Sequence, residues 1–270
     1  MVSTADDRYL DLILSPIRVC ARYKPKFGQK AGLAGLSLIE FQTLYRGDPF
    51  YSWFGLDNAL MYAAHKAAGG MTSIYRQIGI GCEKMFRAVI QDTLRLSAAD
   101  VIWSYRIPTA KAGKSRKLSL DGRIPIASVS DAAARLRIQE WMLASAAQLA
   151  VNQNIAEVLN GIVFEVRQGY KSKDSKRQQA DIANAAVAYS KAYLPCAVIL
   201  SAQIDGDILD RYRREQWTVL TGRMGLNDPR VSTYDFMREV VGYDLAAFFA
   251  RHAQTLRAEL DTVLKNLLSP

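Results

Sequence analysis

The sequence predicts an α/β protein with a mixed central sheet flanked by helices and with helical extensions at both ends. Between residues 71 and 225, short runs of β-branched and aromatic residues alternate with stretches of helical period. Regions 1–70 and 226–270 show mainly helical spacing of apolar residues. We therefore expect a helical N-terminal region (1–70), an α/β core (71–225) and a C-terminal helical region (226–270) packed on the core or on a partner.

Apolar spacing in the N-terminal region predicts a short helix over residues 5–22 and helical structure over 36–66. The turn signal Gly47-Asp48-Pro49 interrupts the second stretch. Because glycine disfavours a helix interior, Ala67-Ala-Gly-Gly70 predicts a break before a further helix that ends near residue 94.

The core alternates predicted strands and helices along the chain. The order predicted is a strand at 100–107, a strand at 118–125, a helix at 130–159, a strand from 161, a helix at 178–193, a strand at 195–204, a helix at 207–216 and a strand at 217–220. A final helix over 233–268 carries an apolar stripe, which predicts packing on its own domain or, as the alternative, on a partner helix.

Composition limits the class of protein. The chain has 270 residues, half of them apolar, a net charge of +9 and a pI near 9.5. A large core and an anionic partner such as DNA, RNA or a membrane surface are consistent with these values. The three cysteines lack metal-like spacing, the N-terminus lacks a secretory pattern, and no apolar run reaches the length of a membrane span. We expect a cytoplasmic protein.

The strand that begins at Gly161 carries the clearest chemical signal. Because side chains alternate along a strand, Glu165 and Arg167 lie on one face, and Lys171 shares that face if the strand continues. A carboxylate among apolar strand residues needs a partner or a metal, or an edge position. Arg167 could satisfy Glu165 as a structural ion pair, which is the alternative to a functional role.

Two more acids could join Glu165. Asp121 ends the preceding strand, although Asp-Gly is also an ordinary turn pair, and Glu83 lies on the earlier helix, where a solvated role is the alternative. Phosphodiester hydrolysis uses a divalent metal held by oxygen ligands together with a positive group that stabilises the transition state. Glu83, Asp121 and Glu165 are the candidate ligands.

These features resemble the PD-(D/E)XK nuclease superfamily, and within it the type II restriction endonucleases, over residues 72–222. The residues that carry the resemblance are Glu83 on a helix, Asp121 at a strand end, the triplet Glu165-Val166-Arg167 in the next strand, and Gln178 or Gln179 in the helix after it. The resemblance implies a restriction-endonuclease-like core and magnesium held by the acids. It also implies catalytic roles for Asp121, Glu165, Arg167 and Lys171.

The sequence departs from the family pattern at the lysine of the triplet. Arg167 stands there, and its high pKa leaves it electrostatic stabilisation but no general-base role. In one alternative, Lys171 replaces the missing lysine. In another, the literal acid-any-lysine triplet is Asp174-Ser175-Lys176, with Glu165 as the second acid.

Two basic loops adjoin the strands that carry these acids. Their cations alternate with small residues that allow close approach to a phosphate backbone. The residues we expect to bind DNA are Lys111, Lys114, Arg116, Lys117, Lys173, Lys176, Arg177 and Gln178. No phosphate-binding loop or complete dinucleotide motif occurs, so the sequence predicts no nucleotide cofactor.

The sequence and the resemblance together predict a magnesium-dependent, sequence-specific endonuclease of restriction type that hydrolyses double-stranded DNA. Cutting both strands of a palindrome needs two active sites, so a homodimer is implied. A basic nucleic-acid-binding protein without catalysis and an RNA-directed nuclease are the alternatives.

Overall fold

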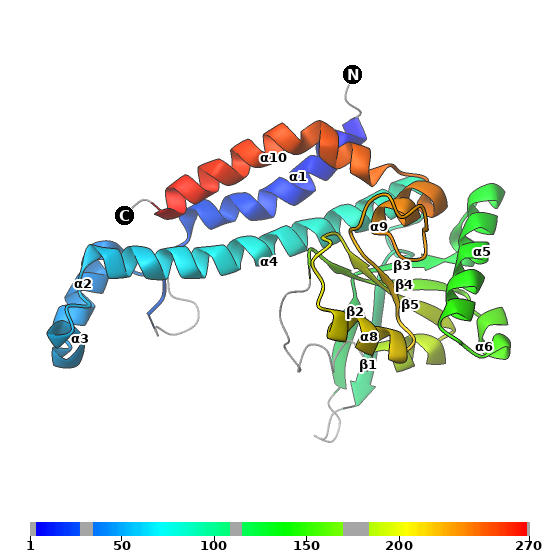
Figure 1. Cartoon of the computed structure of the whole chain (residues 1–270), viewed down its shortest axis with the longest axis horizontal. Helices are drawn as coiled ribbons and strands as arrows, with labels where there is room; N and C mark the ends of the chain where they lie inside the picture. The colour runs from blue at the N-terminus through cyan, green and yellow to red at the C-terminus, as the bar shows by residue number, and fades with distance from the viewer. Residues whose placement is uncertain (1–3, 28–34, 109–114, 170–183, 269–270) are drawn as a thin grey trace. The chain divides into compact units, whose positions relative to one another are not determined.

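A computed structural model describes residues 4–27, 35–108, 115–169 and 184–268 (Figure 1). The chain forms two compact units, and the first contains both termini. Residues 1–81 and 251–270 belong to the first unit, and residues 82–250 belong to the second. This division differs from the three consecutive regions expected from the sequence, because the last helix shares a unit with the first.

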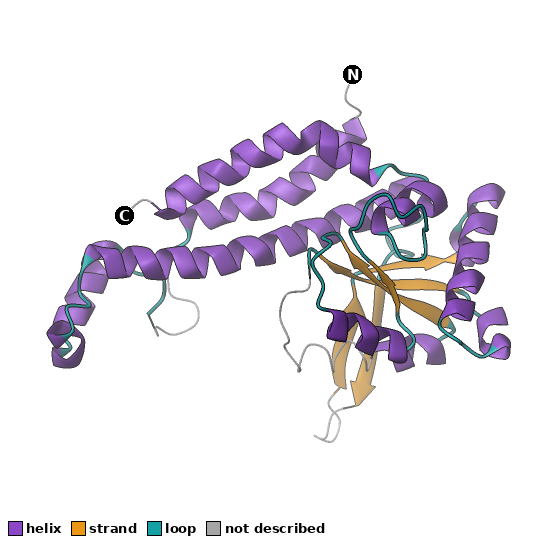
Figure 2. Ribbon diagram, in the orientation of Figure 1, coloured by secondary structure: helices purple, strands orange, loops and turns teal. Residues whose placement is uncertain are grey.

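Helices joined by loops make up the described residues of the first unit (Figure 2). Its short helices begin at residues that cap them: Ser37 and Glu40 form a reciprocal capping box, and Asp48 caps the next helix with Pro49 in its first position. Its elements are α1 (Thr4–Arg18), the 3₁₀ helix η1 (Val19–Arg22), α2 (Leu38–Arg46), α3 (Pro49–Trp53), most of α4 (Ala59–Thr93) and most of α10 (Leu245–Leu268).

The break predicted at Gly69-Gly70 was wrong, because α4 continues through both glycines. Other parts of the first unit pack closely against these positions. A Cβ atom at residue 69 would lie 2.0 Å from the Tyr23 hydroxyl, and one at residue 70 would lie 2.7 Å from a Leu267 methyl carbon. The glycines make room for neighbouring side chains, and that packing outweighs their low helix propensity.

From Arg251 onward, α10 belongs to the first unit. Val263 and Leu267 are buried. An exposed ion pair joins Arg18 of α1 to Glu259 at 2.6 Å, and Arg251 pairs with the buried Asp6 at 2.5 Å. These ion pairs join α10 to α1 within the first unit, and packing of the helix on a partner stays a prediction.

The second unit is a mixed α/β structure. It comprises β1 (Trp103–Pro108), β2 (Ser115–Leu120), β3 (Gly122–Pro125), η2 (Ile126–Ser128), α5 (Ala132–Gln148), α6 (Gln153–Glu157), β4 (Gly161–Arg167), β5 (Tyr193–Ile199), α8 (Gly206–Arg214), β6 (Thr218–Leu220), α9 (Thr233–Asp235) and the π-helix η3 (Phe236–Val241). Residues 184–190 are also helical.

The described strands form two small sheets. β1 and β2 make an antiparallel hairpin, and the larger sheet has the order β3-β4-β5-β6. β3 runs antiparallel to β4, whereas β4, β5 and β6 are parallel. β4 thus lies inside the larger sheet, and both of its faces are available for burial.

Apolar side chains cover both faces of β4. On one face Phe164 contacts Phe86 of α4, with ring centroids 5.1 Å apart, and Phe236 of η3 at 5.9 Å. On the other face Val163 belongs to a buried cluster with residues of β1, β5, β6 and α8. A strand buried on both sides explains the nearly continuous apolar run in its sequence.

Three predicted elements are divided in the structure. The strand expected over 118–125 is β2 and β3, separated at Asp121, and the helix expected over 130–159 ends at Gln148, shortly before Ala150 with φ +52°. The helix expected over 233–268 is interrupted at Gly242, whose φ of +95° suits glycine.

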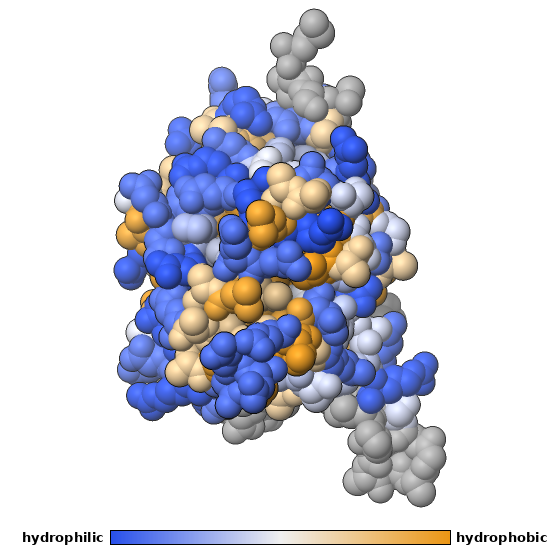
Figure 3. All heavy atoms as spheres, turned by 90° about the vertical axis from the view of Figure 1, so that its right-hand side faces the viewer, coloured by the Kyte–Doolittle hydropathy of each residue, from blue (hydrophilic) through white to orange (hydrophobic). Residues whose placement is uncertain are grey.

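The predicted mixed α/β class with flanking helices is confirmed at this level. Cys20, Cys82 and Cys196 are buried and unbridged, in agreement with the sequence. Within the described ranges, no helix combines the length and apolarity needed to cross a membrane. Figure 3 shows hydrophobic side chains scattered among hydrophilic ones on one side of the molecule; exposed apolar residues of α5 and α6 include Leu136, Leu143 and Ile155.

Close packing on α4 predicts a large cost for substituting Gly81. A Cβ atom there would lie 2.9 Å from the backbone of Ile13 in α1. We expect Gly81→Ala to lower the free energy of unfolding by about 1–3 kcal/mol in urea denaturation, because backbone must move. Gly206→Ala is the matched control, since nothing lies within 4 Å of its added Cβ. Equal stability of the two variants would contradict the expected clash.

Candidate functional site

Asp121 lies at the bend between β2 and β3 and is bound to β4 through its backbone and its side chain. Its N–H donates to the carbonyl oxygen of Phe164 at 2.7 Å, and its Oδ2 accepts from the N–H of Val166 at 2.8 Å. The carboxylate accepts the strand's N–H in the way that a backbone carbonyl oxygen does in a regular β-ladder. Asp121 is therefore fixed on the strand that carries Glu165, although β3, η2, α5 and α6 separate the two in sequence.

Glu83 and Arg87 approach Asp121 from α4. Arg87 Nε donates to the Asp121 carbonyl oxygen at 2.8 Å, and Arg87 Nη2 pairs with Glu83 Oε1 at 2.8 Å. Glu83 and Arg87 are four residues apart, so they share one face of the helix. Arg87 thus holds the acid of α4 beside the bend that carries Asp121.

The charges around Asp121 oppose one another. Burial, and after it the negative charge of Glu83, raises the pKa of Asp121 to about 6. The hydrogen bond from the Val166 N–H and the cations Arg167 and Arg87 act in the opposite direction and lower it. A carboxyl with a raised pKa next to a second acid is typical of functional sites. It is also a place where a cation would be favourable.

Glu165 and Arg167 form an ion pair on one face of β4, as the strand alternation predicts. Both side chains are largely buried, with 10% and 14% of their surfaces exposed. They lie against Ala197 and Ile199 of β5 and Tyr212 of α8. An arginine so placed neutralises Glu165 and also acts electrostatically on Asp121.

The structure therefore brings together Glu83 and Asp121 at one point and Glu165 and Arg167 on the adjoining strand. Among the described residues, no group of three or more His, Cys, Asp and Glu side chains is arranged to hold a metal ion. A three-acid metal site formed by Glu83, Asp121 and Glu165 thus remains a prediction. Sequence reasoning missed Arg87, although its spacing of four from Glu83 was a usable signal.

Most predicted DNA-binding residues lie outside the described residues. These are Lys111, Lys114, Lys173, Lys176, Arg177 and Gln178, and the candidate catalytic residues Lys171 and Asp174 lie there too. Lys117 is exposed on β2, where it pairs in register with Arg106 of β1. Arg116 occupies the neighbouring position of β2, opposite Ile107.

The raised pKa of Asp121 predicts a pH-dependent stability. An unfolded Asp titrates near pH 3.9, so between about pH 4 and pH 6 the folded chain keeps a proton that the unfolded chain has lost. Ionised Asp121 therefore destabilises the fold increasingly over this window and fully above it. We expect the free energy of unfolding of Asp121→Asn, relative to that of wild type, to increase by on the order of 2–3 kcal/mol as the pH rises from 4 to 7.

Urea unfolding at several pH values measures this difference. The exposed carboxyl of Asp210 on α8 provides the control variant, Asp210→Asn, for the general effect of removing one negative charge. If the difference in unfolding free energy between Asp121→Asn and wild type stays constant from pH 4 to pH 7, folding does not change the pKa of Asp121. That result would contradict the prediction.

The buried ion pair on β4 predicts strong coupling between its partners. Glu165→Leu and Arg167→Met should each lower the free energy of unfolding by about 3–5 kcal/mol, because each leaves a buried charge. The double variant should recover much of that loss, since the uncompensated charge is gone. Chemical denaturation of the four proteins measures the coupling, and strictly additive losses would contradict it.

Comparisons with protein-family models, with curated proteins and with solved structures found no match. No family is therefore assigned to the chain, and its function has to be argued from the residues of the site.

Proposed function

We propose that the protein is a magnesium-dependent, site-specific endonuclease for double-stranded DNA, with the second unit as a restriction-endonuclease-like core. One observation carries the proposal: the Asp121 carboxylate is bound to the backbone of β4 next to Glu165 and Arg167, while burial and then the charge of Glu83 raise its pKa. Two acids and a buried cation around one strand end suit phosphoryl chemistry.

Magnesium fits the donor set at this point. Hard carboxylate oxygens suit this ion, which commonly takes only one or two protein carboxylates and completes its shell with waters and substrate phosphates. Asp121 and Glu83 would hold it, and a divalent cation would relieve the repulsion between them that raises the pKa of Asp121. When bound, the ion would lower the pKa of a water ligand and polarise the phosphate.

The chain's own residues then have separate roles. Arg167 stays protonated and stabilises the negative charge that develops on the phosphate. Glu165 holds Arg167 in place through their ion pair, and Arg87 holds Glu83. Lys171 follows β4 and is the candidate group for activating water, with Lys176 of the Asp174 triplet as the alternative.

The DNA partner is supported by charge. The chain carries +9, and cations neutralising phosphates give affinity without sequence specificity. Cutting both strands of a palindromic site would require two copies of the chain, so we include a homodimer in the proposal.

A second candidate function is nucleic-acid binding without catalysis. It is favoured by the Glu165–Arg167 ion pair, because a salt-bridged carboxylate has its charge satisfied without a metal. In that case Glu165 serves folding, and the basic residues serve only phosphate binding.

Digestion of plasmid and phage DNA with and without Mg²⁺ separates the two functions. We expect discrete fragments from wild type and a loss of about 10²-fold or more in rate for Asp121→Asn and Glu165→Gln. The exposed acids Asp210 and Glu215 give the matched controls Asp210→Asn and Glu215→Gln. Salt-sensitive binding with no cleavage by wild type would support the second function, and cleavage confined to RNA would support an RNA-directed nuclease.

Magnesium binding can be measured without activity. A ligand that binds only the folded chain raises its stability, by about 2.7 kcal/mol at one hundred times the dissociation constant. We therefore expect Mg²⁺ to raise the thermal unfolding midpoint of wild type and of Asp210→Asn, and to have little effect on Asp121→Asn. The same rise in all three proteins would place the ion elsewhere.

A further inference from the structure

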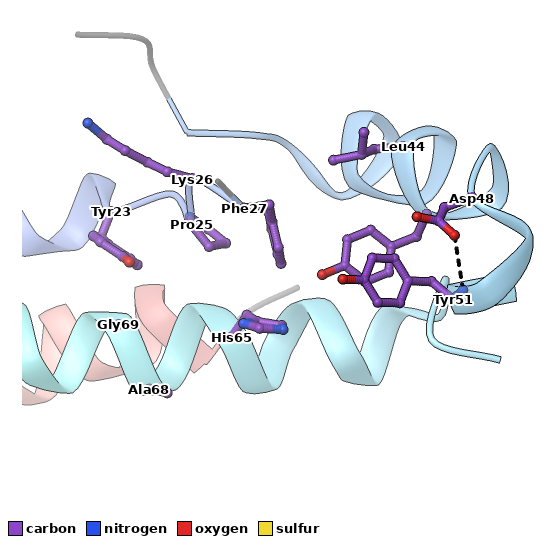
Figure 4. A pocket seen from close by; sticks show the side chains of 11 residues that line it. Tyr23, Pro25, Lys26, Phe27, Leu44, Asp48, Tyr51, His65, Ala68 and Gly69 are labelled. Carbon is purple, nitrogen blue, oxygen red and sulfur yellow. Dashed lines mark hydrogen bonds between the residues drawn. The ribbon is translucent and has the colours of Figure 1, made fainter. Parts of the chain in front are cut away.

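The first unit contains a cavity of about 660 Å³, walled mainly by aromatic side chains (Figure 4). Its walls come from α2, α3, α4 and the segment that follows η1. A volume of this size suits a small organic ligand. The five rings that line it belong to Tyr23, Phe27, Tyr45, Tyr51 and His65.

The rings form a connected set, since Phe27 also meets Tyr45 edge to face at 5.6 Å. Tyr45 of α2 and Tyr51 of α3 are stacked, with centroids 4.7 Å apart and planes 18° from parallel. Phe27 meets His65 of α4 edge to face at 4.8 Å. Figure 4 shows Phe27, Tyr51 and His65 on the same side of α4, around a common space. Flat surfaces and ring edges on several sides favour a planar ligand.

Tyr23, another residue that lines the cavity, packs closely against α4. The Tyr23 hydroxyl lies so near Gly69 that a Cβ atom there would be 2.0 Å away. Gly69, which the sequence marks as a helix breaker, therefore lets Tyr23 rest on the helix backbone at the edge of the cavity.

Polar atoms line the same space. No described group forms a hydrogen bond with the hydroxyls of Tyr45 and Tyr51. Burial raises the pKa of Tyr45. A tyrosine hydroxyl is protonated at neutral pH and can donate or accept a hydrogen bond. Asp48 also lines the cavity, but its Oδ1 accepts from the N–H of Phe50 at 2.9 Å and caps α3.

Of the described residues, one cation, Lys26, and one acid, Asp48, line the cavity. The segment from residue 19 to residue 27 contains Arg22, Lys24 and Lys26 and no acid, and exposed Lys26 lines the cavity itself. Aromatic rings beside exposed cations are the pattern by which proteins bind unpaired nucleotides: bases stack and phosphates meet the cations.

We propose that this cavity binds the base of a nucleotide, with the phosphate towards Lys26. The phenol hydroxyls and the imidazole of His65 then hydrogen-bond to the edge of the base. The base could belong to a free nucleotide or to single-stranded DNA, which share this chemistry. A quaternary ammonium ligand also suits aromatic walls; Lys26 disfavours it, whereas the Asp48 carboxylate does not, so it is the competing ligand in the test.

Fluorescence anisotropy and calorimetry of the full chain in EDTA test the proposal. The probes are deoxynucleoside monophosphates, a labelled single-stranded octanucleotide, a blunt duplex and tetramethylammonium. We expect Tyr51→Ala to weaken nucleotide or single-strand binding by about tenfold or more, because a stacking surface is lost. Tyr51→Phe, which keeps the ring but loses a hydrogen bond, should weaken binding less than Tyr51→Ala. Lys26→Ala should weaken binding and reduce its salt dependence.

The control is Trp53→Ala, which removes an exposed aromatic ring of the same helix that does not line the cavity. Binding of the single strand but not of monophosphates would identify the source as DNA, and the reverse would identify a free nucleotide. Absence of binding by wild type, equal losses in Tyr51→Ala and Trp53→Ala, or binding of tetramethylammonium alone would overturn the proposal. Asp121→Asn should bind normally, so this result is independent of the nuclease assay.

Discussion

The second unit depends on neutralising carboxylates that lie in or beside a strand buried on both faces. Glu165 would be costly in that position without Arg167, and Asp121 would be costlier without the Val166 N–H and the neighbouring cations. Apolar residues could replace the Glu165–Arg167 pair with less conflict, whereas position 121 needs an acceptor for the Val166 N–H. The buried pair on β4 is therefore the stronger argument for the proposed chemistry at this strand.

The same constraint determines how the surrounding elements meet. Arg87 binds Glu83 and the carbonyl of Asp121 at once, so it joins α4 to the bend between β2 and β3. Phe86, the preceding residue, contacts Phe164 of β4 on the apolar side. Neighbouring positions of α4 thus provide one polar and one apolar attachment to the sheet, and the site gains rigidity from the core beside it.

Local pattern was sufficient to predict β4, the shared face of Glu165 and Arg167, and the position of Asp121 at a strand end, because alternation and turn chemistry are local properties. It was insufficient at Gly69 and Gly70, where packing of Tyr23 and Leu267 decides the outcome. The bond from Arg87 to the Asp121 carbonyl and the aromatic cavity depend on residues distant in sequence. Neither could be read from spacing alone.

The bond between the Asp121 side chain and the Val166 N–H also bears on how such a protein would change during evolution. If the proposed activity exists, a descendant that had lost it would still need an acceptor at this position to complete the strand pairing. Selection for folding would then preserve an aspartate or asparagine there long after selection for activity had ended. The presence of this residue in a related sequence would be poor proof of an active enzyme, whereas loss of Glu83 would be a more sensitive sign, because no strand pairing depends on it.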